Sequence, residues 1–239
     1  MRIARILTLA AALIALAMMI AAGPGTRYGY WNYQAGLSML AWATYAGIGA
    51  ALVSVILIAL LAVKRWRSQA WMPMTAFVIA LATIGPPVAL LFKAKAVPPI
   101  HDITTDTADP PAFVALMTER IAAPNGAAYG GAAIAKQQEA AYPDIKPLET
   151  KDSLPVATQR AADIGRGMGW EIVATDPAAG RVEATATTGW FGFKDDIVVR
   201  VRAQAGGGSL VDVRSVSRVG RSDIGANAAR IREFLAHLA

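Results

Sequence analysis

Several kinds of residue are scarce or missing in this chain of 239 residues. It has no cysteine, which excludes disulfide frameworks, thiolate nucleophiles, cysteine-ligated zinc and iron–sulfur clusters. It has only two histidines, and residues 1–97 contain no aspartate or glutamate. Since an ionisable group inside the membrane is the usual mark of a proton-coupled or cation-coupled carrier, the acid-free first half gives such a carrier little support.

What is present is strongly apolar and unevenly charged. Hydrophobic residues make up 55% of the chain and charged residues only 17%, which is too apolar for an ordinary soluble domain. The net charge of +6 divides unequally, because residues 1–97 hold eight basic and no acidic residues, whereas residues 98–239 hold fifteen basic and seventeen acidic ones. This pattern predicts a membrane region with an attached polar domain, and it removes the main support for a nucleic-acid partner.

Three apolar runs predict membrane-spanning helices within a transmembrane region at 1–97. They cover about residues 6–22, 36–63 and 71–92, and the second and third are long enough to cross a hydrocarbon core of about 30 Å. The first run, behind Arg2 and Arg5, also fits a signal peptide that is removed after Gly23. Gly85-Pro86-Pro87 interrupts the third run, where the missing amide donors are expected to kink the helix.

Basic residues near the helix ends predict the orientation. Arg2 and Arg5 and the turn 64–67 supply five Lys or Arg on one side, and Arg27, Lys93 and Lys95 supply three on the other. This bias predicts a multi-pass protein of the bacterial inner (cytoplasmic) membrane with a cytoplasmic N-terminus and a periplasmic domain at 98–239. Cleavage of the first segment would not change the side on which that domain lies.

The lipid bilayer is therefore the first expected partner. Tyr and Trp at 28–33, 66 and 71 predict anchoring in the headgroup layer. Ala43, Gly47 and Ala51 form a small-residue face on the second helix, which allows close packing against another helix in this chain, against a protein partner, or in self-association.

Residues 98–239 predict an α+β domain, a two-layer arrangement in which an antiparallel four- to five-stranded sheet packs against helices. Alternating apolar residues predict strands at 170–175, 181–187, 196–202 and 210–217, with a further short strand within 100–105. Helical spacing predicts a helix that starts at Asp109, a second at 154–168 and a third from about Asp223. Residues 123–148 show no clear period and are expected to form an irregular loop.

Two segments are interpreted as binding surfaces. Trp190, Phe191 and Phe193, separated by glycine in a hairpin, either cover the core or contact the bilayer or a partner. The second segment predicts a site for a small anion or a lipid headgroup at the entrance to the last helix, and its residues are Arg214, Arg218, Arg221, Asp223, Asn227 and Arg230. The alternative is a structural network in which Ser222 or Asp223 caps the helix and aspartates pair with the arginines.

An enzymatic alternative depends on His101, which has Asp102 and Asp106 nearby. One imidazole is a poor transition-metal site, and no Gly-x-Ser-x-Gly or His-Glu-x-x-His motif occurs, so we assign no catalytic residue, metal or cofactor. His237 is interpreted as a surface residue at a helix C-terminus. A hydrolase or transferase that uses His101 is therefore the second hypothesis, and an accessory component of a transporter is the third.

The last segments also carry a family resemblance. TTGWFGFKDDIVVRV at 187–201 and VDVRSVSRVGRSDIGANAARIREFL at 211–235, with PPIHDITTD at 98–106, resemble the domain-of-unknown-function family numbered 1499. The resemblance spans about residues 98–239, and the three helices place the chain with its membrane-anchored members. It implies an envelope-associated or membrane-associated domain but no established activity. The leading hypothesis is a non-catalytic membrane protein whose α+β domain binds a partner or a small anionic or lipid ligand.

Overall fold

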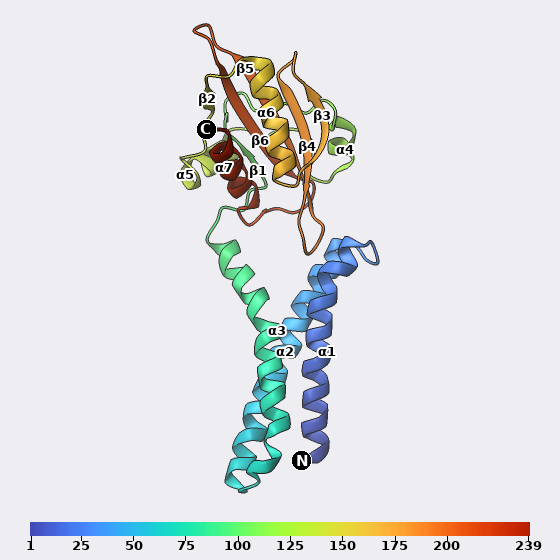
Figure 1. Ribbon diagram of the computed structural model, residues 1–239. Helices are drawn as coiled ribbons and strands as arrows, with labels where there is room; N and C mark the ends of the chain where they lie inside the picture. Colours follow the sequence, from blue (N-terminus) through green and yellow to red (C-terminus); the bar gives the residue numbers. More distant parts are fainter. The chain divides into compact units, whose positions relative to one another are not determined.

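The computed structural model describes all residues from 1 to 239 (Figure 1). The chain divides into two compact units. The first comprises Met1–Lys93 together with Gly189–Gly192, and the second comprises Ala94–Thr188 and Phe193–Ala239.

Three long helices form most of the first unit, as predicted. They are α1 (Arg2–Arg27), α2 (Tyr33–Val63) and α3 (Trp71–Lys95), and a short 3₁₀ turn, η1 (Arg67–Gln69), precedes α3. All three are long and apolar enough to cross a membrane. Each helix runs beyond its predicted bounds. Helix α1 extends from Arg2 to Arg27, α3 ends at Lys95, and α2 begins at Tyr33, where the Asn32 side chain caps it.

The helices include their prolines. Helix α1 continues past the expected end at residue 22 and includes Pro24, and α3 runs through Pro86 and Pro87 without a break in the helix. In apolar surroundings, leaving helical geometry would expose further backbone groups that find no partner in lipid. One missing N–H per proline is therefore tolerated.

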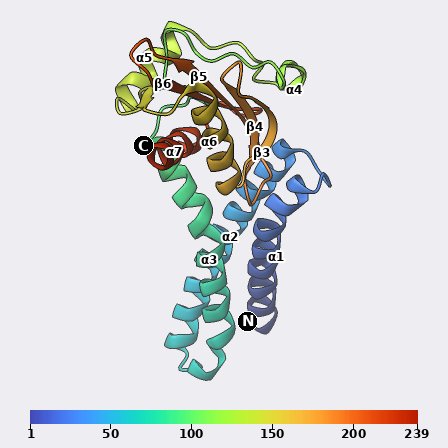
Figure 2. The same cartoon turned by 45° about the horizontal axis from the view of Figure 1, so that its top comes forward.

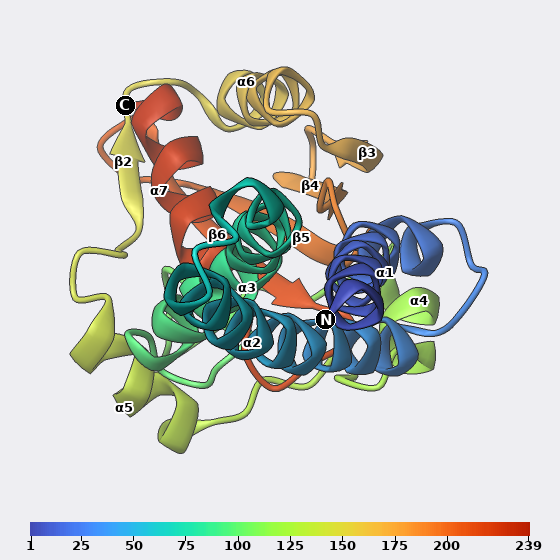
Figure 3. The ribbon, with the colours of Figure 1, turned by 90° about the horizontal axis from the view of Figure 1, so that it is seen from below.

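Small residues let the helices approach closely. Ala43 is fully buried, and a Cβ atom added at Gly47 would lie 3.1 Å from Ile84 Cγ1 of α3. All three helices contribute to a buried cluster of small residues, Ala12, Ala50, Ala76 and Ala80. Figure 3 shows the three helices from below. Packing within the chain thus accounts for part of the Ala43/Gly47/Ala51 face, and association with a partner through it stays a prediction.

The second unit is built on one antiparallel sheet. Five of its six strands follow the order β1-β6-β5-β4-β3, and the sixth, β2, also pairs with β6. The strands are β1 (Asp102–Thr104), β2 (Leu148–Thr150), β3 (Glu171–Asp176), β4 (Arg181–Thr187), β5 (Lys194–Ala203) and β6 (Ser209–Ser217), and the helices are α4 (Met117–Ala122), α5 (Ala132–Ala141), α6 (Leu154–Gly167) and α7 (Ala226–Leu238). The α+β fold with an antiparallel sheet packed on helices is confirmed.

One face of the sheet forms the main core with α6 and α7. Alternate strand residues such as Val182, Val199 and Val213 are buried on this face, as period-two patterning predicts. Trp170 and Phe234 stack at a centroid distance of 5.2 Å beneath them. This arrangement places α7, and the loop that enters it, at one end of β6.

The opposite face is covered by an irregular segment, residues 106–130, which we call the strap (Figure 2). Its Phe113 and Leu116 pack on Val198 of β5 and Val216 of β6 in a second, smaller core. The strap contains only one short helix, α4. The sheet is therefore covered on both faces, although only one face carries long helices.

Two predictions about this region are wrong. The helix expected from Asp109 is reduced to the six residues of α4, because the N–H groups of Val114, Ala115 and Leu116 donate to the Glu183 carboxylate instead of to a helical turn. The loop expected at 123–148 contains α5, whose Ala-rich sequence has high helix propensity but little apolar periodicity.

Candidate functional site

Adjacent residues on β5 send carboxylates to opposite faces of the sheet. Asp195 contacts Arg230 of α7, and Asp196 contacts Arg120 and Arg218 on the strap side. The pleat requires this separation, as expected for neighbouring strand residues. It divides the polar side chains of the domain into two networks.

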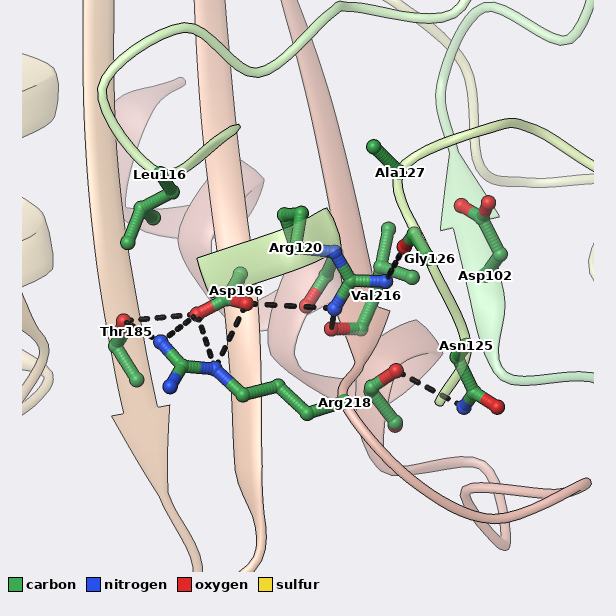
Figure 4. A network of polar contacts seen from close by, with 12 residues as sticks. Asp102, Leu116, Arg120, Asn125, Gly126, Ala127, Thr185, Asp196, Val216 and Arg218 are labelled. Atoms are coloured by element: carbon green, nitrogen blue, oxygen red, sulfur yellow. Dashed lines mark hydrogen bonds and ion pairs between the residues drawn. The ribbon is translucent and has the colours of Figure 1, made fainter. Parts of the chain in front are cut away.

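The strap-side network centres on Asp196, which is fully buried (Figure 4). Its carboxylate accepts hydrogen bonds from Arg218 Nε at 2.9 Å and Nη2 at 2.8 Å, from Arg120 Nη1 at 3.3 Å and from the Thr185 hydroxyl at 2.9 Å. The hydrogen bonds with Asp196 raise the pKa of Arg218. One carboxylate thus holds two guanidinium groups.

Arg120 brings a positive charge into the fully buried space under the strap. Burial lowers the pKa of Arg120, and the Asp196 charge opposes that shift. Its Nη1 also donates to the Val216 carbonyl at 3.2 Å, and its Nη2 donates to the Gly126 carbonyl. Nearby, Asn125 donates to the carbonyls of Ser217 and Gly220 (Figure 4). These contacts join α4 and the end of the strap to β6.

Arg214 anchors the rest of the strap. Its guanidinium binds Asp102 of β1 through Nε at 3.0 Å and Nη2 at 2.7 Å, with the Arg214 side chain only 4% exposed. It also donates to the carbonyls of Pro111 and Ala127. Arg214 therefore ties both ends of the strap to the sheet.

The helix-side network lies where α7 crosses the ends of β5 and β6. Arg230 donates to Asp195 at 2.7 Å and to the Ser215 hydroxyl at 3.0 Å. Asn227 accepts from Ser215 and donates to the His101 carbonyl and the Ser217 hydroxyl, each at 3.0 Å. Every polar group of Asn227 is therefore engaged within the domain.

The loop between β6 and α7 is held in an unusual conformation. Asp223 accepts hydrogen bonds from the N–H groups of Gly225 and Asn227, each at 2.8 Å, so the capping interpretation is confirmed. Burial raises the pKa of Asp223, although those two bonds oppose the shift. Ile224 has φ +55°, a strained value for a β-branched residue. The side chain of Arg221 in this loop is exposed and has no partner.

The six residues of the predicted anion site therefore lie in three places. Arg214 and Arg218 are under or beside the strap, Asn227 and Arg230 are on the helix side, and Arg221 and Asp223 are in the loop between them. The Asn227 amide donates to Asp223, and Arg230 donates to the Asn227 side chain. The three arginines Arg214, Arg218 and Arg221 do not share a common acceptor. Ligand binding by this set stays a prediction.

The hairpin aromatics are at the turn between β4 and β5. Trp190 is half-buried and Phe191 is 7% exposed, and their rings meet edge to face at a centroid distance of 5.0 Å. Phe193 is half-buried at the start of β5. The tip residues Gly189–Gly192 group with the membrane helices in the first compact unit.

The acidic residues near His101 have other partners. Asp102 binds Arg214, and Asp106 binds Arg200 and Arg202. The Nδ1 atom of His101 lies 3.5 Å from the carbonyl oxygen of Arg221. His101 is thus not paired with either aspartate that the enzymatic alternative requires.

Arginine pairing singles out two side chains. Residues 94–239 contain eleven arginines, and nine of them form ion pairs with aspartate. The remaining two are Arg181 and Arg221. Arg221 was among the predicted site residues, but Arg181 was not. The buried residues Arg120, Glu183 and Asp196 were not predicted either, and Asp102 was expected only as a neighbour of His101. These residues are far apart in the sequence and form no local motif. Only the alternation of side chains along β4 and β5 places Glu183 and Asp196 on the same face of the sheet.

Comparison with known protein families identifies the family of the second unit. A family model described as a protein of unknown function (DUF1499) matches residues 102–238. No curated protein matches the chain.

We expect Asp196→Asn to lower the free energy of unfolding by about 3 to 5 kcal/mol, because it leaves the buried Arg120 charge without a counter-ion. Asp163→Asn is the matched control, since Asp163 and its partner Arg166 are mostly exposed and their pair contributes about 1 kcal/mol or less. Urea unfolding of the detergent-solubilised full chain would measure both. Equal losses would show that Asp196 does not hold the strap.

Tyr129 provides a pH-dependent test of the strap. Burial, aided by the Asp102 charge, raises the pKa of its phenol to about 12, above the ordinary value of 10.0. The folded state therefore keeps this proton when the unfolded chain has lost it, so stability falls as the pH rises from 10 towards 12. Tyr129→Phe should show a smaller fall in urea unfolding over this range. An identical fall in the variant and the native chain would contradict the assignment.

Proposed function

The chain belongs to the DUF1499 family of proteins of unknown function, and on that premise we propose that it is a membrane-anchored binding protein. In this proposal the three apolar helices fix the protein in the bacterial inner membrane. The α+β domain is presented on the periplasmic side and binds an anionic small molecule or lipid headgroup without transforming it.

The orientation is supported by the basic residues that flank the helices. Five Lys or Arg at the start of α1 and in the turn between α2 and α3 are retained on the cytoplasmic side, opposite three at the other helix ends. Helix α3 then leads into the domain on the side with fewer positive charges.

The observation that carries the binding role is the free guanidinium of Arg221. The neighbouring arginines 214, 218 and 230 all bind aspartates, whereas Arg221 is exposed without any acceptor. Its loop is nevertheless fixed by the bonds of Asp223 and by Asn125, which donates to the Gly220 carbonyl. An exposed arginine on a fixed loop suits the capture of a phosphate or carboxylate group.

Arg218 also keeps one donor free. Its bonds to Asp196 and Thr185 use Nε and Nη2, which leaves Nη1 without a protein acceptor, and the side chain is 22% exposed. The amides at the start of α7 are not the principal donors in this proposal, because Asp223 already accepts from the Asn227 amide and from that of Gly225, just before the helix. Recognition therefore depends on arginine side chains.

Fusions of a phosphatase reporter test the orientation. Because alkaline phosphatase requires the periplasm, we expect low activity for a fusion after Val63 and high activity for one after Ala239. Matched fusions to a cytoplasmic reporter should show the reverse pattern. An active phosphatase after Val63 together with an inactive one after Ala239 would overturn the orientation.

Loss of the Arg221 charge tests the binding site. We expect Arg221→Ala to weaken binding of a short-chain anionic phospholipid to the detergent-solubilised full chain by about tenfold, as for the loss of one charge-assisted contact. Calorimetric titration would measure the affinity, with a zwitterionic phospholipid as the reference ligand.

Arg166→Ala is the control, because Arg166 is an exposed arginine on α6, away from the β6–α7 loop. It should leave the affinity unchanged. If both variants bind like the native chain, or both lose affinity equally, the loop is not the binding site.

A further inference from the structure

The second unpaired arginine lies in an unfavourable electrostatic position. Arg181 at the start of β4 is directly opposite Arg200 of β5 in the antiparallel register. Residues in this relation have Cβ atoms about 5 Å apart, and like charges placed so are destabilising. The pair therefore calls for anions that offset its charge.

Only Arg200 forms ion pairs with such anions. Arg200 donates to Asp212 at 3.1 Å, to Asp106 at 3.1 Å and to Asp109 at 2.8 Å. Burial lowers the pKa of Arg200, but the charges and hydrogen bonds of Asp212 and Asp109 outweigh this and raise it. Its guanidinium is thus surrounded by carboxylates.

The carboxylates nearest Arg181 in the sheet are committed elsewhere. Asp176, its partner on β3, accepts from the turn amides of Ala178 and Ala179. Glu183, two residues along β4 on the same face, accepts three strap amides. The half-buried Arg181 consequently forms no ion pair within 4 Å, and its guanidinium donors have no acceptor in the chain.

A cavity of about 250 Å³ lies beside the two arginines. Its apolar wall comes from Pro111, Ala112 and Val114 of the strap and from Val198 of β5. The volume is below the usual range for drug-sized ligands, about 300 to 1,000 Å³. The cavity therefore suits a compact molecule that has one charged end and a short apolar body.

We propose that this cavity binds a small organic carboxylate, with Arg181 as its principal ionic partner and Arg200 as the second. A planar carboxylate matches the guanidinium fork, and the apolar wall receives the rest of the molecule. This site is separate from the β6–α7 loop and does not depend on ligand binding there.

Asp109 acts as an internal competitor in this arrangement. Its side chain is 74% exposed, yet its Oδ2 atom accepts from Arg200 Nη1. The ligand carboxylate takes over that Nη1 contact, while Asp212 and Asp106 keep the rest of the Arg200 guanidinium in place. The strap aspartate therefore lowers the apparent affinity by occupying a donor that the ligand needs.

Isobutyrate is a suitable probe, with isobutyramide as its uncharged isostere and inorganic phosphate as a second anion. Ligand-observed NMR on the detergent-solubilised full chain would give the affinities. We expect isobutyrate to bind, isobutyramide to bind at least tenfold more weakly, and phosphate to bind more weakly than isobutyrate. Preference for phosphate, or equal binding of the acid and the amide, would overturn the proposal.

Variants identify the residues involved. Arg181→Gln should weaken isobutyrate binding about tenfold and Asp109→Ala should strengthen it severalfold, whereas Arg166→Gln on α6 should change nothing. Without ligand, Arg181→Gln should change the unfolding temperature little, since it removes both the repulsion from Arg200 and the attraction to Asp176 across the strands. Unchanged affinity in both Arg181→Gln and Asp109→Ala would exclude this cavity as the site.

Discussion

The buried carboxylate of Asp196 is the contact on which the second face of the sheet depends. An irregular segment such as the strap has too few apolar side chains to cover three strands by hydrophobic contact alone, and only Phe113 and Leu116 serve that purpose. The strap is instead attached through polar contacts. Asp196 of β5 holds Arg120 of α4, and Arg214 of β6, which pairs with Asp102 of β1, donates to the strap carbonyls of Pro111 and Ala127. Buried ion pairs of this kind contribute little net stability, but they penalise any other arrangement heavily because a misplaced partner leaves a buried charge. The polar contacts therefore determine where the strap lies more than how stable the domain is.

The extent to which the sequence predicted this fold follows from the range of the interactions. The strands β4, β5 and β6 and the helices α6 and α7 repeat their apolar residues at periods of 2 and 3.6, so each is recognisable from its own residues. The strap has no such period, because its conformation is set by acceptors far away in the chain. Glu183 draws the amides of residues 114–116 out of a helix from a distance of nearly seventy residues. Within the apolar helices the local effect of proline is weaker, since α1 includes Pro24 and α3 includes Pro86 and Pro87.

The candidate site was predicted only in part, because some of its contacts are local in the sequence and others are long-range. The capping role of Asp223 is local and was among the two readings that the sequence supported, and the structure confirms it. The gathering of Arg214, Arg218 and Arg230 was expected from their closeness in sequence. The sheet separates them, because Arg214 and Arg218 share the strap face while Arg230 reaches Asp195 on the other side. Predicting that division required the register between β5 and β6 and the crossing position of α7, and neither has a local signal.

Charge pairing also explains why binding should occur at the margins of this domain. An arginine that already binds a buried aspartate cannot offer its charge to a ligand without leaving that aspartate unpaired, which costs several kcal/mol. The nine paired arginines are therefore poor principal donors, and Arg200 and Arg218 can contribute only the Nη1 group that their buried aspartates do not use. Arg221 and Arg181 have no such obligation, and each lies where the interior network ends, one in the loop before α7 and the other at the first residue of β4. Asp109, whose carboxylate is largely exposed, forms an ion pair with Arg200, so this guanidinium lies within reach of a carboxylate at the domain surface. The network that positions the strap thereby leaves two cations at its edges for anions from outside the chain.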